Sequence, residues 1–340
     1  MWGGNMGGKT TDHWLDGYLG TYAGEESKGV YRFSFRERDG ALTGPDLFFQ
    51  ARNAKWVSLY EDRLVIPLEK EGVAGICLLR LADGSIVSRD EVFAQAQTCC
   101  FILQEQGFIY SANYHDGTVM VYELKAGRPV LVKRIECGAG AGCHQILLHG
   151  GCLMVPCLTQ HKICLFDRTR SFSPAGEISF PMGSGPRHGV FNATHTMLYV
   201  VSEWSNELFI FDVAGSRFTL RQALSILPTE PAPGGMGKRA AAAAIRLTGD
   251  ERFLYLSIRE QELLAVVDVT GREAEVIQHV PCGGKHPRDV ILSPDNRFLL
   301  VLNRSEGGLI SIRRDEHSGK LLERCGKIEV PEGVSIVLSQ

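Results

Sequence analysis

Residues 197–213 read MLYVVSEWSNELFIFDV, two apolar runs joined by a short polar segment. Each run is rich in the β-branched and aromatic residues that strands prefer, and the polar segment is typical of a hairpin turn. The same pattern occurs seven times along the 340 residues, in copies that start at Asp16, Arg63, Phe108, Cys152, Met197, Phe253 and Phe298. Five of the spacings are 44 to 47 residues and one is 56. This period is typical of the four-stranded blades of a β-propeller.

A second repeated segment precedes six of the hairpins and also ends the chain. The copies are NAKWVSL (53–59), TCCFIL (98–103), CHQILL (143–148), PRHGVF (186–191), AAAAIRL (241–247), PRDVIL (287–292) and PEGVSIVLS (331–339). The last copy has no hairpin after it, and the first hairpin has no such segment before it. We therefore expect the C-terminal strand to complete the N-terminal blade, which closes the ring and protects its edges. The sequence predicts an all-β fold, one seven-bladed β-propeller domain over residues 16–340 after a flexible tail over 1–15.

The composition narrows the classes of partner. A net charge of -3 and a pI near 6.4 argue against a general nucleic-acid surface, which needs a basic excess. No apolar run approaches the roughly 18 residues of a membrane span, and the N-terminus lacks the apolar region of a signal peptide. The ten cysteines include no C-x-x-C pair and mostly lie in apolar runs, as small buried hydrophobes do. We expect a soluble cytoplasmic protein that binds neither nucleic acid nor membrane and uses no metal or cofactor; the oligomeric state stays open.

The repeat also predicts which residues meet in space. The first strand of each propeller blade lines the central channel, so equivalent residues at the strand starts become neighbours at one mouth. The equivalents of Arg187 are Lys55, Cys99, His144, Ala243, Arg288 and Glu332. The second strand of each hairpin returns to the same mouth and brings Tyr22, Glu69, Tyr114, Leu158, Glu203, Arg259 and Arg304. We expect two concentric and mainly polar rings there.

Two interpretations of these rings remain. Channel mouths are wet, so polar side chains there can simply be solvated. Alternatively, Arg187, Arg259, Arg288 and Arg304 supply planar cations for a phosphate or carboxylate, and His144, His188 and Glu203 move protons near neutral pH. A concave site of such mixed chemistry is the default ligand site. The longest spacing between repeats is caused by the Pro- and Gly-rich residues 227–240, which include Lys238 and Arg239. This segment forms either a loop at the rim of the mouth or an ordinary solvated insertion.

Three stretches carry a family resemblance. They are GCHQILLHGGCLMVPCLTQHKICLFD (142–167), GSGPRHGVFNATHTMLYVVSEWSNELFIFDV (183–213) and GGKHPRDVILSPDNRFLLVLNR (283–304). Together they resemble the lactonase family of seven-bladed propellers, which includes bacterial 6-phosphogluconolactonases and fungal carboxymuconate lactonising enzymes. The resemblance runs from about Tyr18 to the C-terminus. The resemblance supports the fold more strongly than it supports any particular substrate.

The resemblance implies functional roles for His144 in G-C-H, for Arg187 and His188 in G-P-R-H, and for Glu203 and Arg259 after the next two hairpin strands. The sequence departs from the family pattern in two places. Cys100 stands where many members have His, which puts one ligand contact in doubt. Ser202 stands where many members have Asn before the Glu, and the carboxylate itself is kept.

The resemblance implies hydrolysis of a sugar lactone, with 6-phosphoglucono-1,5-lactone as the small-molecule substrate. We expect His144, Glu203 and Arg187 to be catalytic, although either Glu203 or His144 could accept the proton from water. The expected substrate-binding residues are His188, Arg259, Arg288, Arg304 and Tyr114. Two alternatives are a cyclase acting on a muconate-type lactone and a non-catalytic scaffold. The scaffold is disfavoured because the Trp-Asp and Gly-His signatures of WD repeats are missing from the blades.

Overall fold

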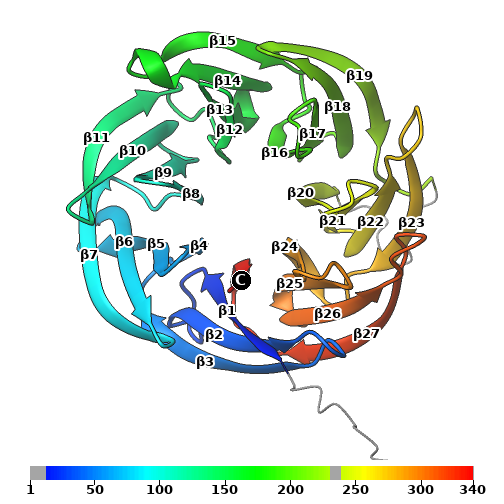
Figure 1. Ribbon diagram of the computed structural model, residues 1–340, viewed down its shortest axis with the longest axis horizontal. Helices are drawn as coiled ribbons and strands as arrows, with labels where there is room; N and C mark the ends of the chain where they lie inside the picture. The colour runs from blue at the N-terminus through cyan, green and yellow to red at the C-terminus, as the bar shows by residue number, and fades with distance from the viewer. Residues whose placement is uncertain (1–12, 230–238, 340) are drawn as a thin grey trace, which may run out of the picture.

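The computed structural model describes residues 13–229 and 239–339. Seven four-stranded antiparallel sheets stand around a central channel like the blades of a propeller (Figure 1). The predicted seven-bladed β-propeller is therefore confirmed. The described residues contain no helix that is long and apolar enough to cross a membrane; two short 3-10 turns, η1 (Leu158–Gln160) and η2 (Arg168–Arg170), interrupt the strands.

The blades are numbered in chain order, and each is given from its innermost to its outermost strand. Blade 1 is β28 (Gly333–Leu338), β1 (Trp14–Thr21), β2 (Gly29–Arg36) and β3 (Leu42–Gln50). Blade 2 is β4 (Ser58–Tyr60), β5 (Arg63–Lys70), β6 (Val73–Ala82) and β7 (Ser85–Gln95). Blade 3 is β8 (Phe101–Glu105), β9 (Phe108–Asn113), β10 (Thr118–Lys125) and β11 (Arg128–Glu136). Blade 4 is β12 (Leu147–His149), β13 (Cys152–Cys157), β14 (Lys162–Asp167) and β15 (Ser173–Ser179).

The remaining three blades keep the same order. Blade 5 is β16 (Pro186–Phe191), β17 (Met197–Ser202), β18 (Glu207–Ala214) and β19 (Arg217–Ser225). Blade 6 is β20 (Ala241–Leu247), β21 (Phe253–Arg259), β22 (Leu263–Asp268) and β23 (Glu275–Pro281). Blade 7 is β24 (Lys285–Leu292), β25 (Phe298–Glu306), β26 (Leu309–Arg314) and β27 (Leu321–Ile328).

The apolar core lies between neighbouring blades. Every residue of β21 is buried, because its sheet is covered on both faces by the sheets beside it. One apolar cluster joins Val201 of blade 5 to Leu254 of blade 6, and another joins Phe33 of blade 1 to Phe298 of blade 7. Strands that are covered on both faces read as continuous apolar runs, which is why the hairpin repeat is visible in the sequence. The outermost strand β19 instead consists only of exposed and half-buried residues.

The ring closes as the repeat predicts. β28 pairs with β1 in antiparallel register from Gly17 opposite Leu338 to Thr21 opposite Gly333. β1 begins at Trp14, so residues 14 and 15 belong to the first blade and not to a tail, while residues 1–12 lie outside the described residues. The part of the insertion over 230–238, which includes Lys238, also lies outside them, and Arg239 is exposed.

Candidate active site at the channel mouth

The polar residues singled out by the repeat meet at one end of the central channel. A hollow of about 10 Å³ there is lined by Tyr22, Lys55, Trp56, Cys100, His144, Arg187, His188, Arg288 and Val334. Glu203, Tyr114 and Arg304 contact these residues, and Arg259 contacts Glu203. We call the whole group the polar mouth. Most lining side chains come from innermost strands and from the loops that lead into them, and Tyr22 directly follows β1, the second strand of blade 1. Ring geometry thus brings together positions that are far apart in the chain.

A carboxylate is held between two arginines in the polar mouth. Glu203 Oε2 lies 3.0 Å from Arg187 Nε and 2.9 Å from Arg259 Nη2. Both arginine side chains are almost completely buried, whereas the Glu203 side chain keeps 19% of its surface exposed. Arg187 Nη1 also donates to the Ala243 carbonyl at 2.6 Å, and Arg259 Nε donates to the Ala241 carbonyl at 3.0 Å. The two guanidinium groups are thus fixed by backbone as well as by charge.

Two histidines lie side by side next to this group. His144 Nδ1 is 3.2 Å from His188 Nε2, and Arg187 Nη1 lies 3.4 Å from the His188 ring nitrogens. Arginine can only donate, so a neutral His188 that accepts from it on Nδ1 carries its proton on Nε2. In this tautomer His188 donates to His144 Nδ1, and a neutral His144 carries its own proton on Nε2. The edge of the His188 ring is held by Phe101 and Trp56, whose ring centroids are 5.8 and 6.2 Å away.

A second positive group surrounds an aromatic ring at the same mouth. Tyr22 has Arg304, Arg288 and Lys55 over its ring at 4.6, 5.9 and 5.9 Å from the centroid. Arg288 Nη2 donates to the Tyr22 hydroxyl at 3.2 Å. Arg304 Nε is 2.7 Å from a carboxylate oxygen of Glu332. Arg304 is therefore paired with a carboxylate, whereas Arg288 contacts the ring and hydroxyl of Tyr22 and Lys55 contacts its ring.

Burial and the concentration of positive charge shift the titration of the central groups. Burial first, and then the arginines, lower the pKa of both His144 and His188 well below the usual value, so both rings are neutral at pH 7. Burial alone would raise the pKa of Glu203, but Arg187 and Arg259 outweigh it and the pKa is lowered. Burial, together with the nearby arginines, lowers the pKa of Arg187 to about 9, which leaves it charged. At neutral pH the site contains a carboxylate, two neutral imidazoles and a positive surround.

The structure places the other predicted site residues with two differences. The Tyr114 ring packs against His144 with centroids 5.8 Å apart, and Arg304 lies at the edge of the mouth. Cys99 does not reach the mouth: it is fully buried between blades 2 and 3, and Cys100 lines the hollow instead. Adjacent strand residues point to opposite faces, so a shift of one position exchanges the two cysteines. Ala243 is fully buried and contributes a carbonyl, not a side chain.

Lys55, Tyr22 and Trp56 line the hollow but were not among the expected catalytic or binding residues. The repeat placed Lys55 and Tyr22 in the two polar rings at the mouth, and only their roles were not assigned. Trp56 follows Lys55 directly and is placed by tertiary contacts: its Nε1 donates to the Ile102 carbonyl at 3.0 Å. The two rings take two positions from each blade, and Trp56 stands at neither of them.

A larger cavity of about 740 Å³ lies at the opposite end of the channel. Trp56 lines both cavities. The lining of the larger cavity is mostly aliphatic, and its Arg246 is paired with the buried Asp289 at 2.9 Å. Convergent cationic and proton-transfer groups lie at the polar mouth, which is therefore the better candidate for chemistry.

Comparison with known proteins agrees with the geometry. The family model described as "Lactonase, 7-bladed beta-propeller" matches residues 16–338. The chain belongs to this lactonase family. A 6-phosphogluconolactonase of Bacillus subtilis (strain 168) is 25% identical over 94% of this chain and 97% of its own length.

Solved structures of similar proteins share the propeller. A Lactobacillus plantarum protein has a TM-score of 0.88 at 25% identity and covers 96% of this chain and 100% of its own. The periplasmic gluconolactonase of Pseudomonas aeruginosa has a TM-score of 0.85 at 22% identity, with 96% and 99% covered. The second similarity supports the fold alone. Membership of the lactonase family supports lactone hydrolysis as the general activity.

Proposed function

We propose that this lactonase-family protein hydrolyses 6-phosphoglucono-1,5-lactone to 6-phosphogluconate at the polar mouth. The observation that carries the proposal is a partly exposed carboxylate, Glu203, fixed by two buried arginines beside a pair of neutral histidines. The name of the Bacillus subtilis relative supports the phosphorylated substrate. The hollow at the floor of the mouth is about the size of one water molecule, so the lactone lies above it.

The phosphate is assigned to Arg288 and Lys55. Arg187 and Arg259 already hold Glu203, so binding a phosphate through them would compete with that carboxylate. Arg288 and Lys55 instead surround Tyr22, and their charges are available for an anion. A guanidinium and an ammonium group together match the charge of a phosphate monoester.

The hydrolytic step uses the Glu203 carboxylate and the His144 imidazole. Both arginines contact Oε2 of Glu203, which leaves Oε1 to accept a hydrogen bond from water and then its proton. As the water oxygen bonds to the carbonyl carbon, negative charge develops on the carbonyl oxygen, and His144 Nε2–H donates to it. The ring C–O bond then breaks, and the ring oxygen takes the proton held by Glu203. A lactone ester is already reactive, so orientation and modest charge stabilisation suffice.

We also assign the protein to the cytoplasm. The ten cysteines are free, which suits a reducing compartment. The Pseudomonas aeruginosa relative is periplasmic, so fractionation of cells followed by immunodetection is the direct test. Detection in the periplasmic fraction would contradict the assignment.

The activity is tested with purified protein and freshly generated 6-phosphoglucono-1,5-lactone, with subtraction of spontaneous ring opening. We expect rapid hydrolysis that falls by about 10²–10⁴-fold in Glu203→Gln, because the carboxylate can no longer accept a proton. Glu323→Gln is the matched control, since Glu323 forms an exposed ion pair with Arg313 on the outer edge of blade 7. Hydrolysis no faster than the blank would reject this substrate, and conversion of a muconate-type lactone instead would identify a cyclase.

A further inference from the structure

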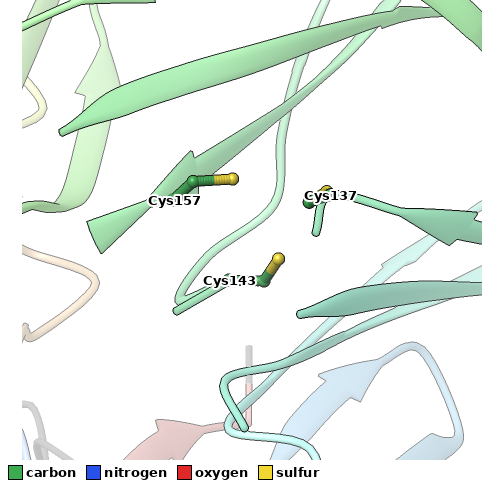
Figure 2. Close-up of side chains that lie close together, drawn as sticks. All are labelled: Cys137, Cys143 and Cys157. Carbon is green, nitrogen blue, oxygen red and sulfur yellow. The ribbon is translucent and has the colours of Figure 1, made fainter. Parts of the chain in front are cut away.

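Four cysteines lie close together around the loop that carries His144. Cys137 follows β11, Cys143 lies in the connection from blade 3 to blade 4, Cys157 ends β13 and Cys164 lies in β14. The sulfur atoms of the first three lie within 4.8 Å of one another, and Figure 2 shows these side chains pointing toward one another. The Cys157 and Cys164 sulfurs are 3.6 Å apart, and Cys164 also interacts with Cys137. We call these four residues the cysteine cluster.

The spacing of the sulfur atoms suits a tetrahedral metal ion. Zinc bound by thiolates has Zn–S bonds of about 2.3 Å, which places neighbouring sulfurs about 3.8 Å apart. The sulfurs of Cys137, Cys143 and Cys157 lie within 4.8 Å of one another, so these three ligands need only small movements of their side chains. Cys164 lies outside this group of three but 3.6 Å from the Cys157 sulfur, and its side chain must turn toward the group to become the fourth ligand. Other cysteines, such as Cys77 and Cys282, sit in the apolar core outside this group, as hydrophobes do. Burial raises the pKa of each of these two thiols to about 12.

The surroundings can accept the charge of a metal–thiolate centre. Lys162, at the start of β14, lies near enough to act electrostatically on Cys157 and Cys164. Its ammonium group also forms an ion pair with the exposed Glu177, whose carboxylate oxygen lies 2.9 Å away. Four thiolates around Zn²⁺ carry two net negative charges, and a nearby lysine offsets part of them. Cys143 and Cys157 are buried, so a bound ion would be shielded from water.

We propose that the cysteine cluster binds one Zn²⁺ ion in a closed site with four thiolate ligands. Soft thiolates select zinc and related ions over magnesium or calcium, and four protein ligands leave no open position for substrate. The site is therefore structural. It fastens the connection over residues 137–146 to β13 and β14, beside the hydrogen bond from the His144 amide to the Pro156 carbonyl at 3.0 Å. The proposal is independent of the lactone chemistry.

Metal content of the isolated full-length chain is the first test. We expect one zinc per chain by elemental mass spectrometry in protein grown with zinc, and none in Cys157→Ser or Cys143→Ser. Cys325→Ser is the matched control and keeps its zinc, because Cys325 is a half-buried cysteine on β27 outside the cluster. Circular dichroism identifies any variant that has failed to fold, and Cys164→Ser serves as the milder substitution because that residue is half-buried.

Titration of the reduced, metal-free chain is the second test. Addition of Co²⁺ is expected to give the intense thiolate-to-cobalt absorption of a tetrahedral sulfur site, saturating at one ion per chain, and Zn²⁺ should displace it. Failure of the folded, reduced chain to bind either ion would overturn the proposal. Equal binding by Cys157→Ser, or a disulfide between cluster residues in freshly prepared protein, would overturn it as well.

Discussion

Lowering the pH is expected to destabilise the fold through the buried histidine pair. His144 and His188 are 5% and 2% exposed, and burial with nearby arginines keeps the pKa of each well below the usual 6.5. The unfolded chain takes up protons on these rings as the pH falls through 6.5, whereas the folded chain does not. Stability from this source is thus complete above the unfolded pKa and is lost as the pH falls below it.

The magnitude follows from proton linkage. When the pH is lowered from about 7.5 to about 5.5, each histidine that stays neutral in the folded state decreases the free energy of unfolding by about 1.4 kcal/mol. Two such histidines decrease it by about 2.7 kcal/mol. His144→Gln should therefore lose about 1.4 kcal/mol less than the wild type over this interval. Subtracting the two pH dependences cancels the contributions of the other titrating groups.

Urea unfolding at the two pH values measures this difference directly. His317→Gln is the control, because His317 is exposed on the turn between β26 and β27, and its pH dependence should match the wild type. An equal loss of stability in wild type and His144→Gln would refute the reasoning. A His144 imidazole that titrates near pH 6.5 by NMR would refute it too.

Three further predictions rest on single contacts. Arg288→Ala should raise KM for 6-phosphoglucono-1,5-lactone about 10- to 100-fold because a charge-assisted contact is lost, and it should change KM for unphosphorylated glucono-1,5-lactone little. Equal effects on both substrates would show that Arg288 does not bind the phosphate. Deleting residues 333–339 removes the strand that closes the ring and should yield aggregated protein in size-exclusion chromatography, and a soluble monomer would argue against closure by β28. Asp289→Ala should cost about 3 kcal/mol in urea unfolding because it leaves Arg246 and the Ile336 amide unpaired, and a loss below about 1 kcal/mol would contradict this.

The fold could be predicted because each blade repeats the same short pattern of apolar and polar residues in the sequence. Each blade needs the same hairpin and the same inner strand, so apolar runs such as 253–259 recur at nearly constant spacing. Closure of the ring also follows, since an inner strand without a hairpin and a hairpin without an inner strand complete each other. The repeat alignment fixes the register of an individual strand less well. It therefore predicts Cys99 at the mouth, where the structure has Cys100.

The site could be predicted as a set of neighbours but not as a set of roles. Ring geometry brings Arg187, Arg288 and Glu203 together, and the alignment of repeats finds them. Which arginine holds the carboxylate depends on side-chain directions that the repeat does not encode, and the structure commits Arg187 and Arg259 to Glu203. The cysteine cluster escaped notice for a related reason: its members are 6, 14 and 7 residues apart, without a C-x-x-C pair, and only the packing of blade 4 brings them together.

A crystal structure of the protein with 6-phosphogluconate bound tests the central claim most directly. The account predicts that the product carboxylate lies within hydrogen-bond distance of His144 and near Glu203, with the phosphate against Arg288 and Lys55. Product bound in the larger, mostly aliphatic cavity, or a phosphate held by Arg187 and Arg259 with Glu203 displaced, would contradict it.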